Sequence, residues 1–257
     1  MARRTTSLLE TLLYRRSLKR WAAAGLAAPK VDLETLRGWR GRAKSLRRLL
    51  DQVIHEADHR LMLPVIGSNS IRKSMGTDWV WRPSLWTGPL PTPGVASVPG
   101  KTQIADGTTI FHDCQHSELT LRQIRNTRDT DVAPFGLRLD VCHFDGSFLS
   151  LVLDLPDEAA RGLKLRHMIR LDAIVEMEKP LELFARLNIK HGPNVEQIVR
   201  EMPLGTEGAM VEFDLAYSKM NEKRVEKLWI DLIFENPEMN EVTVRDLTLS
   251  RRIRAEL

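Results

Sequence analysis

The chain has 257 residues, of which 42% are hydrophobic and 28% are charged, and its formal net charge is +4. This composition is typical of one large globular domain, or of one domain with an appendage, and excludes a wholly disordered protein. No run of about 18 apolar residues is present, which excludes an ordinary membrane-spanning helix. Two cysteines are too few for a disulfide framework.

The positive charge is concentrated at the N-terminus. Residues 1–60 carry fourteen Lys and Arg against six Asp and Glu, a net charge of +8, whereas the rest carries twenty-four against twenty-eight, a net charge of −4. This asymmetry predicts that the N-terminal segment contacts something anionic. The first residues lack the apolar core of a signal peptide. We therefore expect a cytoplasmic protein, peripheral to the inner membrane if the basic segment contacts lipid.

The first sixty residues predict two helices. Four leucines, at positions 8, 9, 12 and 13, recur at helical spacing, and Gly25 and Pro29 end this segment. Asp32 can cap a second helix, because its carboxylate can accept a backbone N–H of the first turn. In that helix, apolar residues alternate at spacings of three and four, which is typical of a coiled-coil seam. The seam consists of Leu36, Trp39, Ala43, Leu46, Leu50, Val53 and Ala57.

Four basic side chains of the first helix are candidate contacts with an anionic partner, namely Arg15, Arg16, Lys19 and Arg20. The sequence leaves several interpretations of this segment open. The helices can form a hairpin with a solvated basic face, bind an anionic membrane surface, bind a protein partner, or pair in a homo-oligomer. No nucleic-acid-binding motif accompanies the basic residues, so nucleic acid is not the expected partner.

From Lys101 onward, apolar and polar residues alternate with period two. This pattern is typical of antiparallel strands with one buried face. About eight to ten strands separated by turn residues predict a mainly β protein, an antiparallel β-sandwich of jelly-roll type, with an immunoglobulin-like strand order as the alternative. We expect residues 1–62 to form the basic helical segment and residues 63–257 the sandwich. The clearest strands are residues 149–155, 169–177, 181–189, 211–217, 228–234 and 242–252.

The segment GTDWVWRPSLWTG, residues 76–88, contains three of the six tryptophans: Trp79, Trp81 and Trp86. Two interpretations remain open. The rings can form a platform on which a sugar stacks, with Asp78 and Arg82 hydrogen-bonding its hydroxyl groups. Alternatively, the rings can cover the edge of the hydrophobic core, which is where tryptophan usually lies.

A second candidate surface is a polar row on the outward side of the predicted strands. It contains Arg186, Asn188 and Lys190, and we expect Asp214 and Tyr217 to lie beside them. Mixed charged and amide groups suit a polyhydroxylated ligand. They suit a plain solvent-facing surface as well.

Several long segments resemble a family of alphaproteobacterial proteins of unknown function. The resemblance covers about residues 65–257 and implies no activity. The segments include GTDWVWRPSLW, FHDCQHSELTLRQIRNTR and VEFDLAYSKMNEKRVEKLWIDLIFENPEMN. A second resemblance is to the closing hairpin of galactose-binding-like and carbohydrate-binding jelly rolls, and it implies the fold more than sugar binding. The residues that carry it are Trp229, Asp231, Val242, Val244 and Asp246.

Metal binding and catalysis have little support in the sequence. His112, Cys114 and His116 alternate along one predicted strand, but they span about 13 Å, too far for one ion. The common nucleophile, zinc and phosphate-binding motifs are missing. We therefore expect a non-enzymatic module without a cofactor that binds a glycan or a glycan-bearing protein. The alternatives are an adaptor attached through its basic helices to a membrane surface or a protein, and, third, a jelly-roll lyase or hydrolase.

Overall fold

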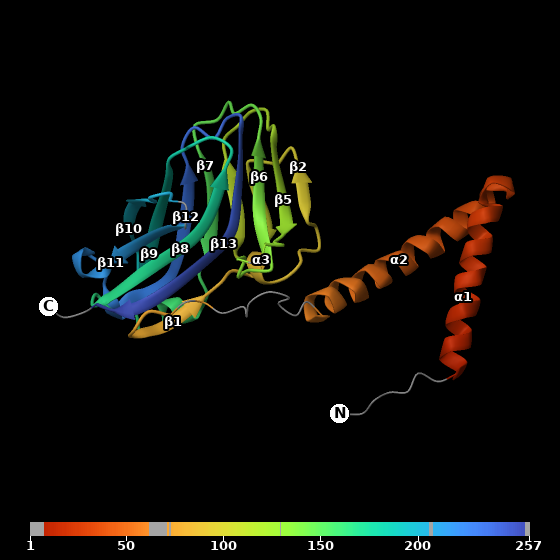
Figure 1. Cartoon of the computed structure of the whole chain (residues 1–257), viewed down its shortest axis with the longest axis horizontal. Coiled ribbons are helices and arrows are strands. Elements are labelled where there is room, and N and C mark those ends of the chain that lie inside the picture. The colour runs from red at the N-terminus through yellow and green to blue at the C-terminus, as the bar shows by residue number, and fades with distance from the viewer. Residues whose placement is uncertain (1–7, 62–70, 72, 129, 206–207, 255–257) are drawn as a thin grey trace. The chain divides into compact units, whose positions relative to one another are not determined.

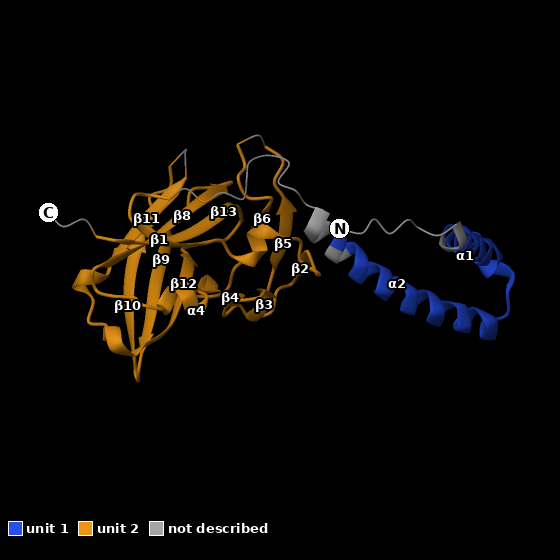
Figure 2. Ribbon diagram, turned by 90° about the horizontal axis from the view of Figure 1, so that it is seen from below, with its two compact units in different colours: residues 1–58 blue, residues 59–257 orange. Residues whose placement is uncertain are grey.

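The chain forms two compact units, Met1–Asp58 and His59–Leu257, which Figure 2 shows in different colours. The expected boundary between residues 62 and 63 lies outside the residues that the computed structural model describes. Within the described part, no helix is long and apolar enough to cross a membrane. The described residues are 8–61, 71, 73–128, 130–205 and 208–254.

The first unit contains two long helices that are joined by a short turn (Figure 1). The elements are α1 (Leu8–Ala27), the 3-10 turn η1 (Ala28–Lys30) and α2 (Leu33–Leu61). Pro29 lies in the turn, as expected. The Asp32 carboxylate accepts a hydrogen bond from the backbone N–H of Thr35 at 2.9 Å, which confirms the predicted cap. This hydrogen bond lowers the pKa of Asp32.

Apolar side chains remain exposed along both helices. Leu13 of α1 exposes 65% of its surface, and Leu50 and Val53 of α2 expose 51% and 66%. Within the described part of the first unit, Leu36 and Trp39 of the predicted seam are half-buried, whereas Leu50 and Val53 are left exposed. The side chains of Leu8 and Leu9, part of the expected leucine stripe, lie outside the description.

The second unit is a β-sandwich, and its described residues form thirteen strands (Figure 1). Sheet A has the order β11-β8-β13-β6-β5-β2, with β1 also paired to β13, and sheet B has the order β10-β9-β12-β7-β4-β3. The strands of sheet A are β1 (Thr77–Trp81), β2 (Gly94–Ala96), β5 (Leu119–Arg125), β6 (Phe135–Val141), β8 (His167–Met177), β11 (Ala209–Asp214) and β13 (Asn240–Ile253). Those of sheet B are β3 (Lys101–Ala105), β4 (Thr108–His112), β7 (Leu149–Asp154), β9 (Leu183–His191), β10 (Asn194–Glu201) and β12 (Val225–Phe234).

All strand pairs between the described strands are antiparallel. The chain crosses repeatedly from one sheet to the other, for example from β7 to β8, from β8 to β9 and from β11 to β12. These features confirm the predicted antiparallel sandwich with jelly-roll-like crossings. Two short helices, α3 (Ser84–Thr87) and α4 (Asp157–Ala160), lie in the connections.

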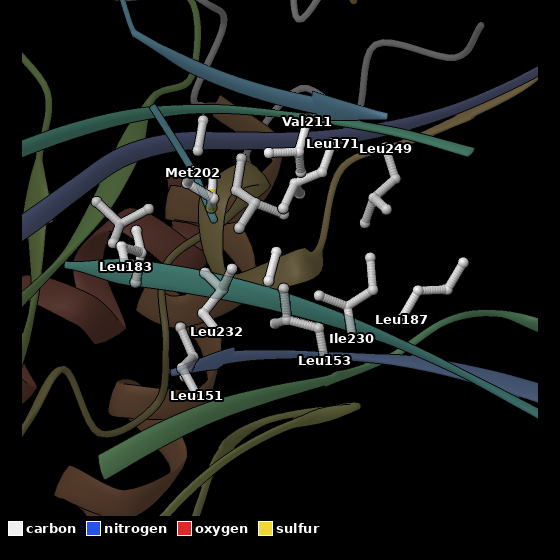
Figure 3. Packing of buried hydrophobic residues seen from close by; sticks show 14 of the residues in the cluster. Leu151, Leu153, Leu171, Leu183, Leu187, Met202, Val211, Ile230, Leu232 and Leu249 are labelled. Carbon is white, nitrogen blue, oxygen red and sulfur yellow. The ribbon is translucent and has the colours of Figure 1, made fainter. Parts of the chain in front are cut away.

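The core lies between the two sheets, where the alternating leucines meet (Figure 3). Leu153 of β7 and Ile230 of β12 are fully buried and face Leu171 and Leu249 of sheet A. Each such side chain contributes about 1.5–3 kcal/mol when it is removed from water. The period-two pattern is therefore the origin of the fold, because it supplies an apolar inner face to every central strand.

Two of the strand predictions were wrong in detail. The strand expected over residues 211–217 ends at Asp214, because its carboxylate accepts a hydrogen bond from the backbone N–H of Ala216 at 3.0 Å and the chain turns. Tyr217 therefore lies beyond the strand, in the 3-10 turn Leu215–Tyr217, and is 80% exposed. Likewise, β4 ends at His112, so Cys114 and His116 do not share a strand with it.

Candidate functional site

The tryptophan segment, residues 76–88, covers one edge of the core. Trp86 is fully buried, and its indole N–H donates a hydrogen bond to the carbonyl of Val244 at 3.0 Å. Trp79 and Trp81 of β1 are half-buried against the core, with their rings stacked at a centroid distance of 6.4 Å. Trp86 therefore offers no ring surface to a ligand.

The polar groups of this segment are also used within the protein. The guanidinium of Arg82 donates two hydrogen bonds to the carboxylate of Asp246, at 2.8 and 2.9 Å. The carboxylate of Asp78 accepts two from Arg251, both at 3.0 Å. Of the two interpretations of the segment, the geometry favours the core cover, because the most buried ring, that of Trp86, and the expected sugar-binding groups all have intramolecular partners.

The outward side of sheet B brings the expected polar row together with residues of two neighbouring strands. Directly opposed residues of antiparallel strands point to the same side of a sheet. The register pairs Asn188 of β9 with Gln197 of β10 and with Trp229 of β12, and pairs Arg186 with Asp231. We call this surface the polar face. It consists of Phe184, Arg186, Asn188, Lys190, Val195, Gln197, Val199, Trp229 and Asp231.

An ion pair lies at the centre of the polar face. The side chain of Asp231 is only 4% exposed, although it points outward, and that of Arg186 is 36% exposed. The Nε and Nη2 atoms of Arg186 contact Oδ2 of Asp231 at 2.7 and 2.6 Å. A carboxylate that has lost its water needs such partners to offset the cost of burial. Because two nitrogens of the guanidinium contact Asp231, the side chain of Arg186 is held in one orientation.

Asn188 links this ion pair to the edge strand. Its amide nitrogen donates to Oδ2 of Asp231 at 3.1 Å, and its amide oxygen accepts a hydrogen bond from Gln197 at 2.8 Å. Asn188 itself is fully buried. The sequence expected Asn188 to contact a ligand, but the structure gives it the role of positioning Asp231 and Gln197.

Apolar groups flank the network. Trp229 is half-buried between Asn188 and Asp154 of β7, and Val199 of β10 is 48% exposed opposite Arg186. Trp229 was used in the sequence only as a sign of the fold. Its outward position could have been read from the alternation of β12, where Leu228, Ile230 and Leu232 are the inward residues.

The other expected members of the row lie elsewhere or at its border. Lys190 is exposed and contacts Glu226 at 2.7 Å, and this contact lowers the pKa of the Glu226 carboxyl. Asp214 is the last residue of β11, which belongs to sheet A, Tyr217 lies in the turn that follows it, and both contact Arg254 instead. The expectation that these two residues join the row is therefore wrong, because the strand that carries them belongs to the other sheet.

The four basic candidates of α1 are all exposed, as expected for contacts with an anionic partner. They are Arg15, Arg16, Lys19 and Arg20. At 100° per residue, however, they lie on the same side of α1 as Leu12 and Leu13. The helix therefore does not separate a basic face from an apolar face. Such a separation occurs in α2.

The described residues contain no group of three or more His, Cys, Asp and Glu side chains that could hold a metal ion. A shallow pocket of about 380 Å³ lies between α3 and β3, lined among others by Ser84, Leu90, Gln103 and Asp106. Burial raises the pKa of the Cys114 thiol, which disfavours the reactive thiolate. Neither the pocket nor Cys114 places a nucleophile beside a general base.

The whole chain, residues 1–257, matches the model of a family described as "Family of unknown function (DUF6478)". The chain therefore belongs to this family. The match includes the two N-terminal helices, beyond the region of about residues 65–257 that the sequence segments indicated. No curated protein matches the chain.

Three solved structures are similar to part of this chain. The enzymatically active domain of tailspike protein 4 of bacteriophage CBA120 has a TM-score of 0.40 and 10% identity, over 60% of this chain and 21% of that chain. The family 11 carbohydrate-binding module of Clostridium thermocellum, bound to a β-1,3-1,4-mixed-linked tetrasaccharide, has a TM-score of 0.39 and 12% identity, over 63% and 97%. The CBM22-1 and GH10 modules of Clostridium thermocellum xylanase 10B, complexed with xylohexaose, have a TM-score of 0.36 and 9% identity, over 59% and 27%.

Proposed function

We propose that this DUF6478 protein is a non-enzymatic glycan-binding module and that the polar face of sheet B is its binding surface. The observation that carries the proposal is the position of Asp231, whose side chain is 4% exposed on the outward side of a sheet. A plain solvent-facing surface leaves its carboxylates in water. Here Asp231 is held under Arg186 and Asn188, at the cost of its hydration.

The chemistry of the face suits a polyhydroxylated ligand. A sugar ring presents an apolar C–H face that packs on an aromatic ring, and Trp229 is the aromatic group beside the network. The Nη1 group of Arg186 makes no hydrogen bond with another described residue, so it can donate to a sugar hydroxyl. Gln197 is exposed on the edge strand and offers an amide next to it.

The network also reduces the cost of binding. A free arginine loses side-chain entropy when it is immobilised by a ligand, by about 0.5–1.5 kcal/mol. Arg186 is already fixed by Asp231, and Gln197 is already bonded to Asn188. Binding would therefore need no cofactor and no rearrangement of the sheet, and the partner is a free glycan or a glycan-bearing protein.

The experiment is native gel electrophoresis of the full chain in gels that contain soluble glucans, xylans, galactans or bacterial exopolysaccharides. We expect at least one polysaccharide to retard the protein, and calorimetry with its oligosaccharides to give the affinity. Trp229→Ala removes the ring, and Gln197→Ala removes an exposed amide without unpairing Asp231. We expect Trp229→Ala to weaken binding by tenfold or more, if the ring contributes about 1.4 kcal/mol.

Arg138→Ala is a matched control for the surface. Arg138 of β6 is 31% exposed on the outward side of sheet A and contacts Asp140 at 2.8 Å. Its loss should leave glycan binding unchanged. The proposal fails if no polysaccharide retards the protein, or if Arg138→Ala weakens binding as much as Trp229→Ala does.

A further inference from the structure

We propose that α2 binds the surface of an anionic phospholipid bilayer. The inference is independent of glycan binding, because it concerns the other unit of the chain. Its starting point is the exposed apolar side of α2. Five large aliphatic side chains there expose between 37% and 66% of their surface. They are Leu46, Leu49, Leu50, Val53 and Ile54.

These side chains form one continuous face. At 100° per residue they lie within an arc of about 140° around α2. A two-stranded coiled-coil seam needs only the narrower stripe of the a and d positions. With Leu36 in an a position, Leu49 and Ile54 fall outside that stripe. The apolar face is therefore wider than self-pairing requires, as in helices that lie in a membrane interface.

A basic flank borders this face. Between Thr35 and Leu50 the sequence contains six Lys and Arg residues and no Asp or Glu. Five of the six lie within an arc of about 100° that adjoins the apolar arc. All are exposed. They are Arg37, Arg40, Lys44, Arg47 and Arg48, while Arg42 lies at the opposite border of the apolar face.

The charge pattern of α2 distinguishes between three partners that could cover its apolar face: a second copy of α2, a nucleic acid and a lipid bilayer. In a parallel pair of α2 helices, Arg42 in a g position would face Arg47 in an e position of the second copy, so like charges would meet. A nucleic acid would neutralise the arginines but would leave five aliphatic side chains in water. An anionic bilayer satisfies both features, since its headgroups meet the arginines and its acyl region accepts the aliphatic face.

The test is co-sedimentation of the full chain with vesicles. The probes are vesicles of phosphatidylcholine alone and of phosphatidylcholine mixed with phosphatidylglycerol. We expect binding only to the phosphatidylglycerol vesicles, and binding that weakens as the salt concentration rises. The double variant Arg40→Glu/Arg47→Glu should weaken binding by more than about tenfold. Leu50→Ser/Ile54→Ser, which keeps the charge, should weaken it by a similar factor.

The matched control is Arg122→Glu/Arg125→Glu, which makes the same charge change at exposed positions of β5. It should leave vesicle binding within about twofold of the unchanged protein. Circular dichroism verifies that each variant keeps its helices. A control variant that loses binding as strongly as the α2 variant would overturn the proposal, because the effect would then be one of net charge.

Three further outcomes would also overturn it. One is the absence of sedimentation with phosphatidylglycerol vesicles. Another is a gel shift of duplex DNA by the protein that Arg40→Glu/Arg47→Glu abolishes, without vesicle binding. The third is a dimer in sedimentation velocity that Leu50→Ser/Ile54→Ser dissociates, without vesicle binding. In that case a second copy, and not lipid, covers the face.

Discussion

The guanidinium of Arg82 donates two hydrogen bonds to the carboxylate of Asp246, although the residues are 164 positions apart in the sequence. The pair is buried, with side chains 3% and 12% exposed. Asp246 lies at an irregularity of β13, where the register shifts between Val244 and Asp246. Since Val244 also accepts the indole hydrogen bond of Trp86, this one point of β13 holds the tryptophan segment in place.

The first prediction concerns this ion pair. Arg82→Ala leaves the Asp246 carboxylate buried without its bidentate partner, and the loss of one member of a buried pair costs about 3–5 kcal/mol. We therefore expect a marked fall in the free energy of unfolding, measured by urea denaturation and tryptophan fluorescence. Lys227→Ala is the control, because the Lys227–Asp154 pair is half-exposed on both sides and is worth about 0–1 kcal/mol. Equal effects of the two substitutions would contradict the assigned role of Arg82.

The second prediction concerns the emission of two tryptophans. Trp86 is fully buried, so its emission should be blue-shifted and insensitive to iodide, whereas Trp229 of the polar face should be quenched in part. The difference spectra of Trp86→Phe and Trp229→Phe against the unchanged protein measure each contribution. Trp86→Phe should also cost about 2 kcal/mol of stability through a cavity and a lost hydrogen bond.

A glycan found in the gel experiment adds a second criterion to this prediction. The bound glycan should reduce iodide quenching only of the emission component that is lost in Trp229→Phe. If the glycan instead reduces the quenching of an emission component that is lost in Trp79→Phe or Trp81→Phe, then the tryptophans of β1 take part in binding. The proposed face would then be wrong.

The fold could be predicted because it depends on a local pattern. Leu149, Leu151 and Leu153 recur at every second position of one strand, so the inner face of that strand can be identified without any knowledge of its neighbours. The edge strand β10 was missed for the opposite reason. Both of its sides are largely exposed, so NVEQIVRE carries no clear alternation.

The candidate site could be predicted only in part. Arg186 and Asn188 were found because they alternate with inward residues of one strand. The partner Asp231 lies 45 positions from Arg186, and periodicity does not indicate which strands are neighbours. The same limit explains why Asp78 and Arg82 looked available for a ligand, since their partners are 173 and 164 positions away.

The basic flank of α2, in contrast, could have been read from the sequence. Spacing the residues at 100° separates Arg40 and Arg47 from Leu46 and Leu50 without any coordinates. The exposure of the leucines could not be read in this way, because the same pattern also fits a helix that is buried against a partner.

The third prediction is a pH dependence that originates at His167. The ring is 4% exposed, and burial together with the nearby Arg251 lowers the pKa of His167, with smaller effects in the same direction from Arg166 and Lys164; Asp78 acts in the opposite direction. The folded state therefore keeps this ring neutral, while the unfolded chain takes up a proton near pH 6.5. The contribution of His167 to stability is full above about pH 6.5 and is lost as the pH falls through that value.

The measurement compares urea midpoints of the unchanged protein and of His167→Gln between pH 7.5 and pH 5.5, a range set by the histidine pKa of about 6.5. The unchanged protein should lose more stability on acidification than the variant. His143 acts with the opposite sign, because its contact with Glu238 raises its pKa, but it is present in both proteins and cancels. A variant with the same pH dependence as the unchanged protein would show that His167 does not titrate as described.

The last prediction is a stabilising substitution in the core. Thr108 of β4 is 1% exposed and is paired with Leu153, and its hydroxyl has no hydrogen-bond partner among the described residues. A buried hydroxyl without a partner costs about 1–3 kcal/mol, and valine has nearly the same shape and suits a strand. Thr108→Val should therefore raise the free energy of unfolding by about 1 kcal/mol. Thr102→Val is the matched control in the adjacent strand, because the hydroxyl of Thr102 donates to the carbonyl of Pro99 at 3.0 Å. Thr102→Val removes this existing hydrogen bond, so it should lower the free energy of unfolding by about 0.5–1.5 kcal/mol. The opposite signs of the two effects would distinguish a hydroxyl without a partner from one that is hydrogen-bonded.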